Sequence, residues 1–230
     1  MESGKIAPIG QKRHIAAQSG KPLLILASAS PRRVDLLAQI GVKPDLIMPS
    51  QCDETPQKQE VPPRYVARIA AAKAHKIAAH LAAHPLEITD GKIRAHESRL
   101  ILAADTTVAV GRRILGQAGD AAAAAKHLTL LSGRRHRVWS AVCVLHLSAG
   151  MEILAEHHKL VRSDVIFKRL HPAEIDHYVA SQEWQGKAGS YAIQGFSAIF
   201  VRQISGSYSN IVGLPLYETA SLLRHYGLVT

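Results

Sequence analysis

Residues 23–41 read LLILASASPRRVDLLAQIG, and this stretch decides the fold. Its first five residues form an unbroken apolar run, which is typical of a short buried β-strand. Small residues follow, and Ser30 and Pro31 suit the N-cap and the first position of a helix. Apolar residues then recur at helical spacing up to Gly41, which can end the helix. The stretch therefore predicts a strand, a tight turn and a helix, which is how an α/β fold begins.

The rest of the chain continues this alternation. Further strands are predicted at 46–48, 99–104, 137–147, 159–169, 191–195 and 199–204, and further helices at 62–84, 120–133, 173–182 and 215–227. The strands at 137–147 and 159–169 can pair through a hairpin, so the twisted sheet is predicted to be mixed, with flanking helices. Residues 1–21 are expected to form a mobile tail, residues 85–98 a loop, and residues 22–230 one domain.

The composition limits the class of protein. The chain has 230 residues, of which 47% are hydrophobic and 20% charged, as in ordinary folded domains. No apolar run approaches the roughly 18 residues of a membrane helix, and the N-terminal residues do not resemble a secretory signal. Two cysteines are too few for a disulfide framework. We therefore expect a cytoplasmic protein with no membrane partner.

Charge and histidine content narrow the range of partners. The net charge of +10 favours anionic partners, including phosphorylated small molecules. The basic residues are scattered, so no stable nucleic-acid complex is expected. The 13 histidines form no HExxH motif, and neither cysteine lies in a Cys/His cluster along the sequence. His157 and His158 would face opposite sides of a strand, so no structural zinc site is predicted.

The segment from Ser28 to Arg33 is the first candidate site. A strand that leads through small residues into a helix leaves backbone N–H groups and the positive end of the helix dipole facing open space. Arg32 and Arg33 add planar guanidinium groups, which match phosphate oxygens. The alternative interpretation is a capped surface helix with two solvated arginines.

Two acidic pairs are candidates for metal or water chemistry. Asp53 and Glu54 lie in a loop, where paired carboxylates can hold a hard cation. Asp105 and Thr106 follow a predicted strand, and ligands in α/β sheets gather at the carboxyl ends of strands. A carboxylate there can bind a metal or orient a water. The alternatives are solvated loop acids and a turn or helix cap.

Two polar loops could contact a phosphate or a base. Arg134 follows Gly133 at the predicted end of a helix, where its charge would equally suit the helix dipole. The loop at 187–195, KAGSYAIQG, sets Lys187 and Gln194 among glycines. Loop packing would explain this pattern as well.

Taken together and in this order, the segments resemble the Maf family of nucleotide pyrophosphatases from residue 24 to the C-terminus. The matching segments are LILASASPRR at 24–33, DET at 53–55, ARIAAAKA at 67–74, AADTTV at 103–108, LSGRRHRV at 131–138, KAGSYAIQG at 187–195 and GSYSNIVGLPL at 206–216. The resemblance implies an elongated α/β fold, related to inosine triphosphate pyrophosphatases, with two lobes around a cleft. It also implies a nucleoside triphosphate substrate, a divalent cation such as Mg²⁺ or Mn²⁺, and a homodimer.

The resemblance assigns roles to single residues. It implies that Glu54 and Asp105 serve as metal and catalytic acids beside Lys73 of the long helix. It places substrate binding at Ser28, Arg32, Arg33 and Gln194. The loop residues Arg134 and Lys187, and Gln117 at a family lysine position, are further predicted substrate-binding residues. Asp105-Thr106 and the 187–195 loop are similar to those of members that act on dTTP and UTP, whereas the subgroup that acts on 7-methyl-GTP usually has Asp-Gln.

One departure from the family pattern bears on activity. The family usually carries Leu-Gly-Lys-Pro-x-Asp where this chain has LGQAGD at 115–120, so Gln117 replaces a lysine. A neutral amide donates hydrogen bonds but cannot neutralise phosphate charge. Reduced activity is one expectation, and substitution by Arg112 or Arg113 is another. The rival functions are a modified-nucleotide pyrophosphatase, a weakly active nucleotide-binding regulator of septum formation, and a nucleic-acid binder whose affinity falls steeply with salt.

Overall fold

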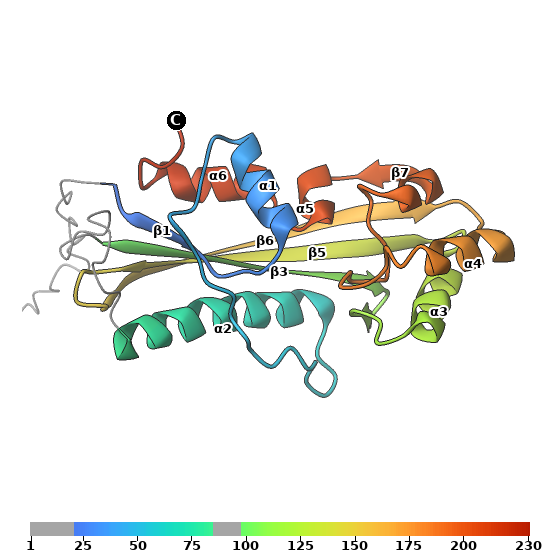
Figure 1. Ribbon diagram of the computed structural model, residues 1–230, viewed down its shortest axis with the longest axis horizontal. Helices are drawn as coiled ribbons and strands as arrows, with labels where there is room; N and C mark the ends of the chain where they lie inside the picture. Colours follow the sequence, from blue (N-terminus) through green and yellow to red (C-terminus); the bar gives the residue numbers. More distant parts are fainter. Residues whose placement is uncertain (1–20, 85–97) are drawn as a thin grey trace, which may run out of the picture.

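A seven-stranded mixed sheet runs along the molecule in the computed structural model, which describes residues 21–84 and 98–230 (Figure 1). The strand order is β2-β1-β3-β5-β6-β7, with β4 paired to β3. The first three strands are parallel and all other pairs are antiparallel. The strands are β1 (Leu23–Leu26), β2 (Leu46–Ile47), β3 (Arg99–Val110), β4 (Arg113–Leu115), β5 (Arg135–Leu147), β6 (Ile153–Phe167) and β7 (Val201–Ser205).

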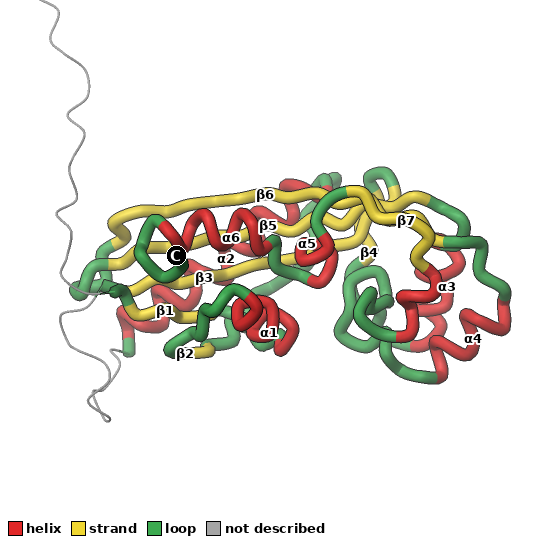
Figure 2. The backbone as a smooth tube through the Cα atoms, turned by 90° about the horizontal axis from the view of Figure 1, so that it is seen from above, coloured by secondary structure: helices red, strands yellow, loops and turns green. Residues whose placement is uncertain are grey.

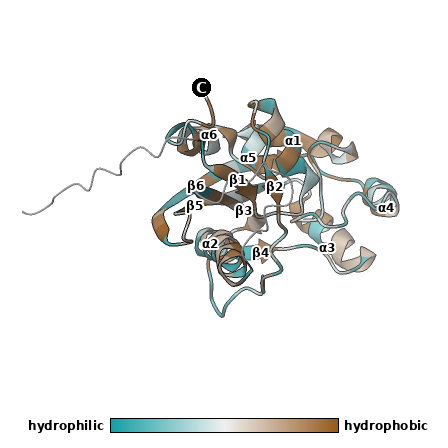
Figure 3. Cartoon of the chain, turned by 60° about the vertical axis from the view of Figure 1, so that its left-hand side comes forward, coloured by the Kyte–Doolittle hydropathy of each residue, from teal (hydrophilic) through white to brown (hydrophobic). Residues whose placement is uncertain are grey.

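Helices cover both faces of this sheet (Figure 3). The long helix α2 packs on one face, and α1, α5 and α6 pack on the other. Helices α3 and α4 lie together at one end of the molecule, away from α1 and α2 (Figure 2). The helices are α1 (Pro31–Gln39), α2 (Pro62–Ala83), α3 (Ala121–Leu131), α4 (Pro172–Ala180), the 3₁₀ helix η1 (Phe196–Phe200), α5 (Tyr208–Val212) and α6 (Leu216–Arg224).

The helix ends follow the local chemistry that the sequence predicted. Pro31 and Pro62 stand in the first turns of α1 and α2, where a missing N–H costs nothing. The carboxylate of Asp120 accepts the N–H of Ala123 and so caps α3. Helix α2 buries the stripe that begins at Val66 and ends at Leu81 against the sheet. None of the described helices combines the length and hydropathy needed to cross a membrane.

The strand predicted at 99–104 is longer than expected, because β3 continues to Val110. Asp105 therefore lies inside a strand and not at its end, which corrects the sequence prediction. Residues 106–110 are Thr-Thr-Val-Ala-Val, and β-branched side chains favour continuation of a strand. Strand alternation then decides the side: Asp105 shares the α2 face with Ala103, and Thr106 points to the opposite face.

Two other predictions differ from the structure. Residues 191–195, predicted as a strand, form a turn in which the Gly195 N–H donates to the carbonyl of Ala192. Tyr191 and Ile193 are both buried, so the alternation in the sequence reflects loop packing and not strand pairing. Helix α5 was not predicted. The hairpin of β5 and β6 is confirmed. The tail over 1–21 and the loop over 85–98 lie outside the described residues, apart from Lys21 and Ser98.

Candidate active site

Two adjoining hollows form a cleft between the start of α1, the middle of β3 and the loop after α4. Because the hollows share several lining residues, they are continuous. The shared residues are Ser30, Arg32, Arg33, Glu54, Lys73, Gln117, Gly186 and Lys187. Ser28 lines one hollow, and Asp105 and Gln194 line the other. Of the predicted site residues, Arg134 and the loop acid Asp53 line neither.

A buried lysine joins the two candidate acids. Lys73 Nζ lies 2.8 Å from Glu54 Oε1 and 2.8 Å from Asp105 Oδ1. Lys73 stands four residues after Ile69 and four before Ile77, on the apolar stripe of α2 that faces the sheet. A lysine on such a stripe needs charge partners, because burial of an unpaired ammonium is costly. The two carboxylates supply them.

The two acids differ in their surroundings. The Asp105 side chain is 8% exposed, whereas the Glu54 side chain is 42% exposed. Burial raises the pKa of Asp105 above its ordinary value, and the positive charges of Lys73 and Arg33 oppose that rise. Asp105 is thus a rigid acid in the sheet, while Glu54 lies on the loop between β2 and α2.

The neighbouring acid Asp53 lines neither hollow of the cleft. Its carboxylate accepts the N–H of Thr55 at 2.8 Å and is exposed. Of the paired acids in this loop, only Glu54 therefore reaches the cleft.

Arg33 is held in place at the start of α1. Its Nε donates to the carbonyl of Gly213 at 3.0 Å, and its Nη1 donates to Ser28 Oγ at 2.9 Å. Burial lowers the pKa of the Arg33 guanidinium, which nonetheless stays charged because an arginine pKa begins far above neutrality. These two hydrogen bonds fix the orientation of the Arg33 guanidinium at the cleft wall.

The N-terminus of α1 also opens on the cleft. Ser30 occupies the predicted N-cap position, but its side chain makes no capping hydrogen bond. Pro31 has no N–H and the Arg33 N–H donates to the Ser30 carbonyl at 3.1 Å, so the helix dipole and the side chain of Arg32 are what this helix end offers an anion. Burial lowers the pKa of Arg32, as expected for a cation held in a partly closed site.

The opposite wall is the loop that contains Lys187 and Gln194. A single β-bridge joins Gln117 to Ala188, and the Gly189 N–H donates to the carbonyl of Leu115 at 2.9 Å. Gly189 has φ +66°, and a Cβ there would lie 2.8 Å from Val108, so this position requires glycine.

Lys187 lies on this wall within electrostatic reach of Arg32. Burial lowers the pKa of Lys187, and the positive charge of Arg32 lowers it further. Two cations near one another on opposite sides of a cleft form a site suited to a multiply charged anion.

Three site residues were not identified from the sequence. The Tyr65 hydroxyl donates to the carbonyl of Glu54 at 2.9 Å and thereby ties the Glu54 loop to α2. The Gly213 carbonyl accepts from Arg33 and, at 3.3 Å, from Thr106. Thr107 also lines the cleft. The segment at 206–216 was recognised as a matching motif, but nothing in its spacing assigned Gly213 to the site.

Arg134 is exposed, lies directly before β5 and does not line the cleft. Its backbone carbonyl accepts the N–H of Phe167, so the residue extends the pairing of β5 with β6 by one hydrogen bond. His136, two residues on, is buried, and its Nε2 lies 2.9 Å from the Tyr191 hydroxyl. Burial lowers the pKa of His136 to about 4, so this histidine is neutral and belongs to the packing around Tyr191.

A family model described as Maf-like protein matches residues 23–226. The chain belongs to the Maf family. It is 50% identical over 204 residues to the dTTP/UTP pyrophosphatase of Zymomonas mobilis subsp. mobilis, which covers 89% of this chain and 91% of that protein. It is 49% identical over 205 residues to the dTTP/UTP pyrophosphatase of Paramagnetospirillum magneticum, with 89% and 97% covered.

Among solved structures, the chain is similar to the nucleoside-triphosphatase / dITP/XTP pyrophosphatase of Mycobacterium abscessus. The TM-score is 0.42 and the sequence identity 18%, with 89% of this chain and 95% of that one covered. The Maf match itself spans every residue that lines the cleft, from Ala27 to Gly213. The cleft is therefore a feature of the Maf region and not of the residues outside it.

Glu54 and Asp105 could hold a divalent cation in this Maf-family cleft. Both offer carboxylate oxygens, which Mg²⁺ and Mn²⁺ prefer, and both reach the same Lys73 nitrogen. The donor set therefore fits a hard cation.

Proposed function

We propose that this Maf-family protein hydrolyses dTTP and UTP to the nucleoside monophosphate and pyrophosphate. The observation that carries the proposal is the pairing of Lys73 with both Glu54 and Asp105, in a cleft that also holds Arg32 and Arg33. Acids and cations are thus combined within one substrate-sized site. The names of relatives about 50% identical over about 90% of the chain support the choice of dTTP and UTP.

The cations bind and stabilise the phosphates. Arg32, Arg33 and Lys187 line the cleft and would hold a triphosphate against the first turn of α1. As the bond between the α- and β-phosphates breaks, negative charge develops on the departing pyrophosphate. Preorganised cations stabilise that charge more than the charge of the bound substrate, and this difference lowers the barrier.

The acids act on water. Glu54 or Asp105 accepts a hydrogen bond from the attacking water and takes its proton as the new P–O bond forms. Lys73 holds the two carboxylates together before substrate binds. A bound divalent cation, held by Glu54 and Asp105, would neutralise phosphate oxygens and position the triphosphate. The residues of the chain supply orientation and the proton acceptor.

The test is a product analysis over ordinary and modified nucleotides, including dTTP, UTP, 7-methyl-GTP and dITP, with Mg²⁺, Mn²⁺ or a chelator. We expect monophosphate and pyrophosphate, fastest from dTTP and UTP, and no turnover with the chelator. Diphosphate with orthophosphate would contradict the cleavage position. A preference for 7-methyl-GTP or a modified purine would contradict the substrate assignment.

A second candidate, a nucleotide-binding regulator with little turnover, rests on Gln117. This residue is exposed, lines both hollows and bridges to Ala188. Neither Arg112 nor Arg113 lines the cleft, so they do not replace the missing family lysine there. Lys187, next to Ala188, is the cation nearest along the chain to that bridge.

We expect Gln117→Lys to raise kcat/KM for dTTP, because it returns positive charge to the triphosphate site. The gain should be about 10-fold. Loss of a preorganised transition-state contact typically lowers the rate by roughly 10²- to 10³-fold, and we expect a smaller effect here because position 117 is exposed. Steady-state kinetics at one Mg²⁺ concentration measure it, and a rise mainly in kcat indicates a transition-state effect.

The control is Gln203→Lys, which adds the same charge at an exposed position of β7 outside the cleft. An equal gain in the control would show a general effect of added charge. No gain at position 117 would show that a cation such as Lys187 already compensates. A wild-type protein that binds dTTP without turnover, and turns over once position 117 is lysine, would favour the regulator.

We also propose that residues 22–230 act as one domain, since the family match covers 23–226 and the sheet draws strands from most of that range. The nucleotide substrate and two free cysteines suit a cytoplasmic enzyme. The homodimer implied by the family resemblance stays a prediction.

A further inference from the structure

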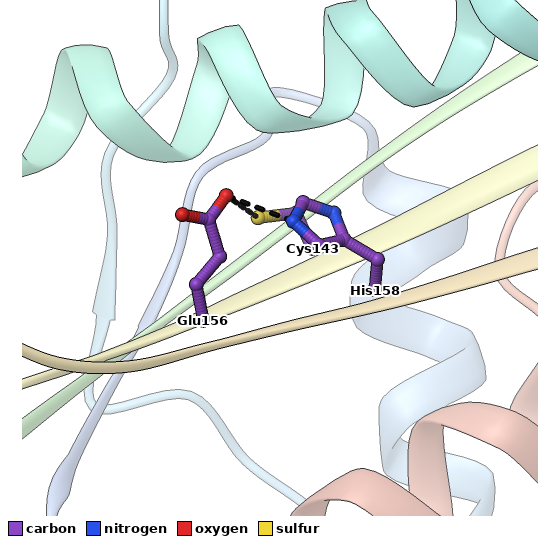
Figure 4. A group of neighbouring side chains, drawn as sticks. All are labelled: Cys143, Glu156 and His158. Atoms are coloured by element: carbon purple, nitrogen blue, oxygen red, sulfur yellow. Dashed lines mark hydrogen bonds and ion pairs between the residues drawn. The ribbon is translucent and has the colours of Figure 1, made fainter.

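Three metal-ligating side chains, Cys143, Glu156 and His158, meet on the α2 face of the sheet, outside the cleft, and His75 of α2 contacts one of them. Cys143 of β5 and His158 of β6 are directly opposite each other in the strand pairing. Glu156 lies two residues before His158 and so shares its face. Figure 4 shows the side chains of Cys143, Glu156 and His158 turned toward one another beneath α2, the helix that carries His75.

These side chains converge on one carboxylate oxygen. Glu156 Oε1 lies 2.9 Å from His158 Nε2, 3.2 Å from His75 Nε2 and 3.9 Å from Cys143 Sγ. In a tetrahedral zinc site the ligand atoms are about 3.4 Å apart for oxygen and nitrogen and about 3.6 Å apart for oxygen and sulfur, given the usual bond lengths. The ligand atoms of Cys143, Glu156 and His158 all lie within 4.8 Å of one another, close to these values. His75 stands outside this group and contacts Glu156 alone, so its part-exposed side chain would turn toward the ion to complete the site.

We propose that His75, Cys143, Glu156 and His158 form a zinc-type metal site that fastens α2 to β5 and β6. Thiolate, imidazole and carboxylate together are the ligands of Zn²⁺ or Co²⁺, whereas Mg²⁺ prefers oxygen alone. The site therefore differs in chemistry from the acids beside Lys73. None of its four ligands lines the cleft.

The charges balance when the ion binds. A thiolate and a carboxylate carry two negative charges, which match a divalent cation, and imidazole binds in its neutral form. Burial and the neighbouring Glu156 raise the pKa of the Cys143 thiol to about 12, so the thiol is protonated without the ion. Binding thus forms the metal–sulfur bond and releases one proton to solvent. The His75, Glu156 and His158 side chains are part-exposed, which leaves an ion a route to the site.

The sequence analysis predicted no structural zinc site, because it found no Cys/His cluster along the chain. The members of the proposed site come from one helix and two strands, and no short spacing links them. Cys143 lies beside Glu156 and His158 in space although no such group is present along the sequence. Pairing of β5 with β6 assembles the group.

The test is a Co²⁺ titration of chelator-treated protein in excess Mg²⁺, followed by the thiolate-to-cobalt charge-transfer band and the visible band of tetrahedral cobalt. We expect one equivalent per chain, released by Zn²⁺. The chain has two cysteines, so Cys143→Ser should remove the charge-transfer band and Cys52→Ser should keep it. His158→Gln should weaken binding by more than the roughly 10- to 100-fold seen when a hydrogen-bond partner of a metal ligand is lost.

Matched controls separate this site from other histidines. His157→Gln changes the next residue, whose side chain contacts Tyr226 and not Glu156. His80→Ala with His84→Ala removes the stacked histidine pair at the end of α2. Both should bind Co²⁺ as the wild type does.

A charge-transfer band that survives Cys143→Ser, or one that is absent from wild-type protein at saturating Co²⁺, would overturn the proposal. So would loss of binding in the His80/His84 variant alone. If Cys143→Ser fails to fold by circular dichroism, the part-exposed His158→Gln variant decides: unchanged affinity there overturns the site.

Discussion

Asp105→Asn is expected to lower kcat/KM for dTTP by about 10²- to 10³-fold while leaving the fold intact. The amide keeps the shape of the buried side chain but removes the charge that a metal or an activated water needs. Because burial disfavours the charged form of Asp105, a neutral replacement relieves part of that cost. The change also removes one of the two charge partners of Lys73, which keeps Glu54, so the unfolding temperature should fall by less than in Lys73→Met. Steady-state kinetics and thermal unfolding measure the two effects.

The loop acids give a matched pair for the same experiment. Glu54→Gln should also cause a large loss, since Glu54 contacts Lys73 and lines the cleft. Asp53→Asn, one residue earlier and outside the cleft, should retain near wild-type rates. Wild-type rates in both Asp105→Asn and Glu54→Gln at saturating Mg²⁺ would remove these acids from the mechanism.

Lys73→Met should cause a loss of similar size and change the pH dependence of the reaction. Lys73 lowers the pKa of Asp105 against the effect of burial, so its removal must raise that pKa further. Asp105 is needed in its ionised form, and its ionised fraction falls as the pH drops through its pKa. The acid limb of the kcat/KM profile should therefore move to higher pH. A profile measured for both proteins tests this.

Stability provides a second measurement for Lys73→Met. Breaking a buried ion pair costs about 3–5 kcal/mol, an upper limit here because Asp105 can take up a proton. Lys126→Met, at an exposed position of α3, is the control for loss of a lysine. An acid limb that stays in place despite reduced kcat would mean that Lys73 acts on substrate alone and does not tune Asp105.

The local elements could be predicted because their signals lie within a few residues. An apolar run indicated β1 and alternating residues indicated β5, and the N-cap at Asp120 and the proline at Pro62 marked the starts of α3 and α2. The end of β3 could not be predicted from its apolar residues, because an aspartate inside a strand looks like a strand end. Only the partner Lys73 on α2 makes that buried position tolerable.

The candidate site was predictable as a set of segments but not as a geometry. The phosphate-binding segment and both acids came from residue order and the family resemblance. The contact of Arg33 with Gly213 joins residues 180 apart in the chain, and no spacing rule reaches that far. Arg134 belongs to a matching segment, yet it lies outside the cleft, because a motif fixes neighbours in sequence and not the direction of each side chain.

Strands β5 and β6 continue from the end where α2 lies to the end where α3 and α4 lie (Figure 1). Enzymes that close by a hinge rotate two bodies about a few loop or element-terminal residues. Here the two ends share the same hydrogen-bonded strands, so there is no linker among the described residues about which they could rotate. Capture of a substrate is thus a task for the loop that carries Glu54 and the loop that carries Lys187. Asp105, paired in the sheet with Ala141, is expected to move less than Glu54 and Lys187 on their loops.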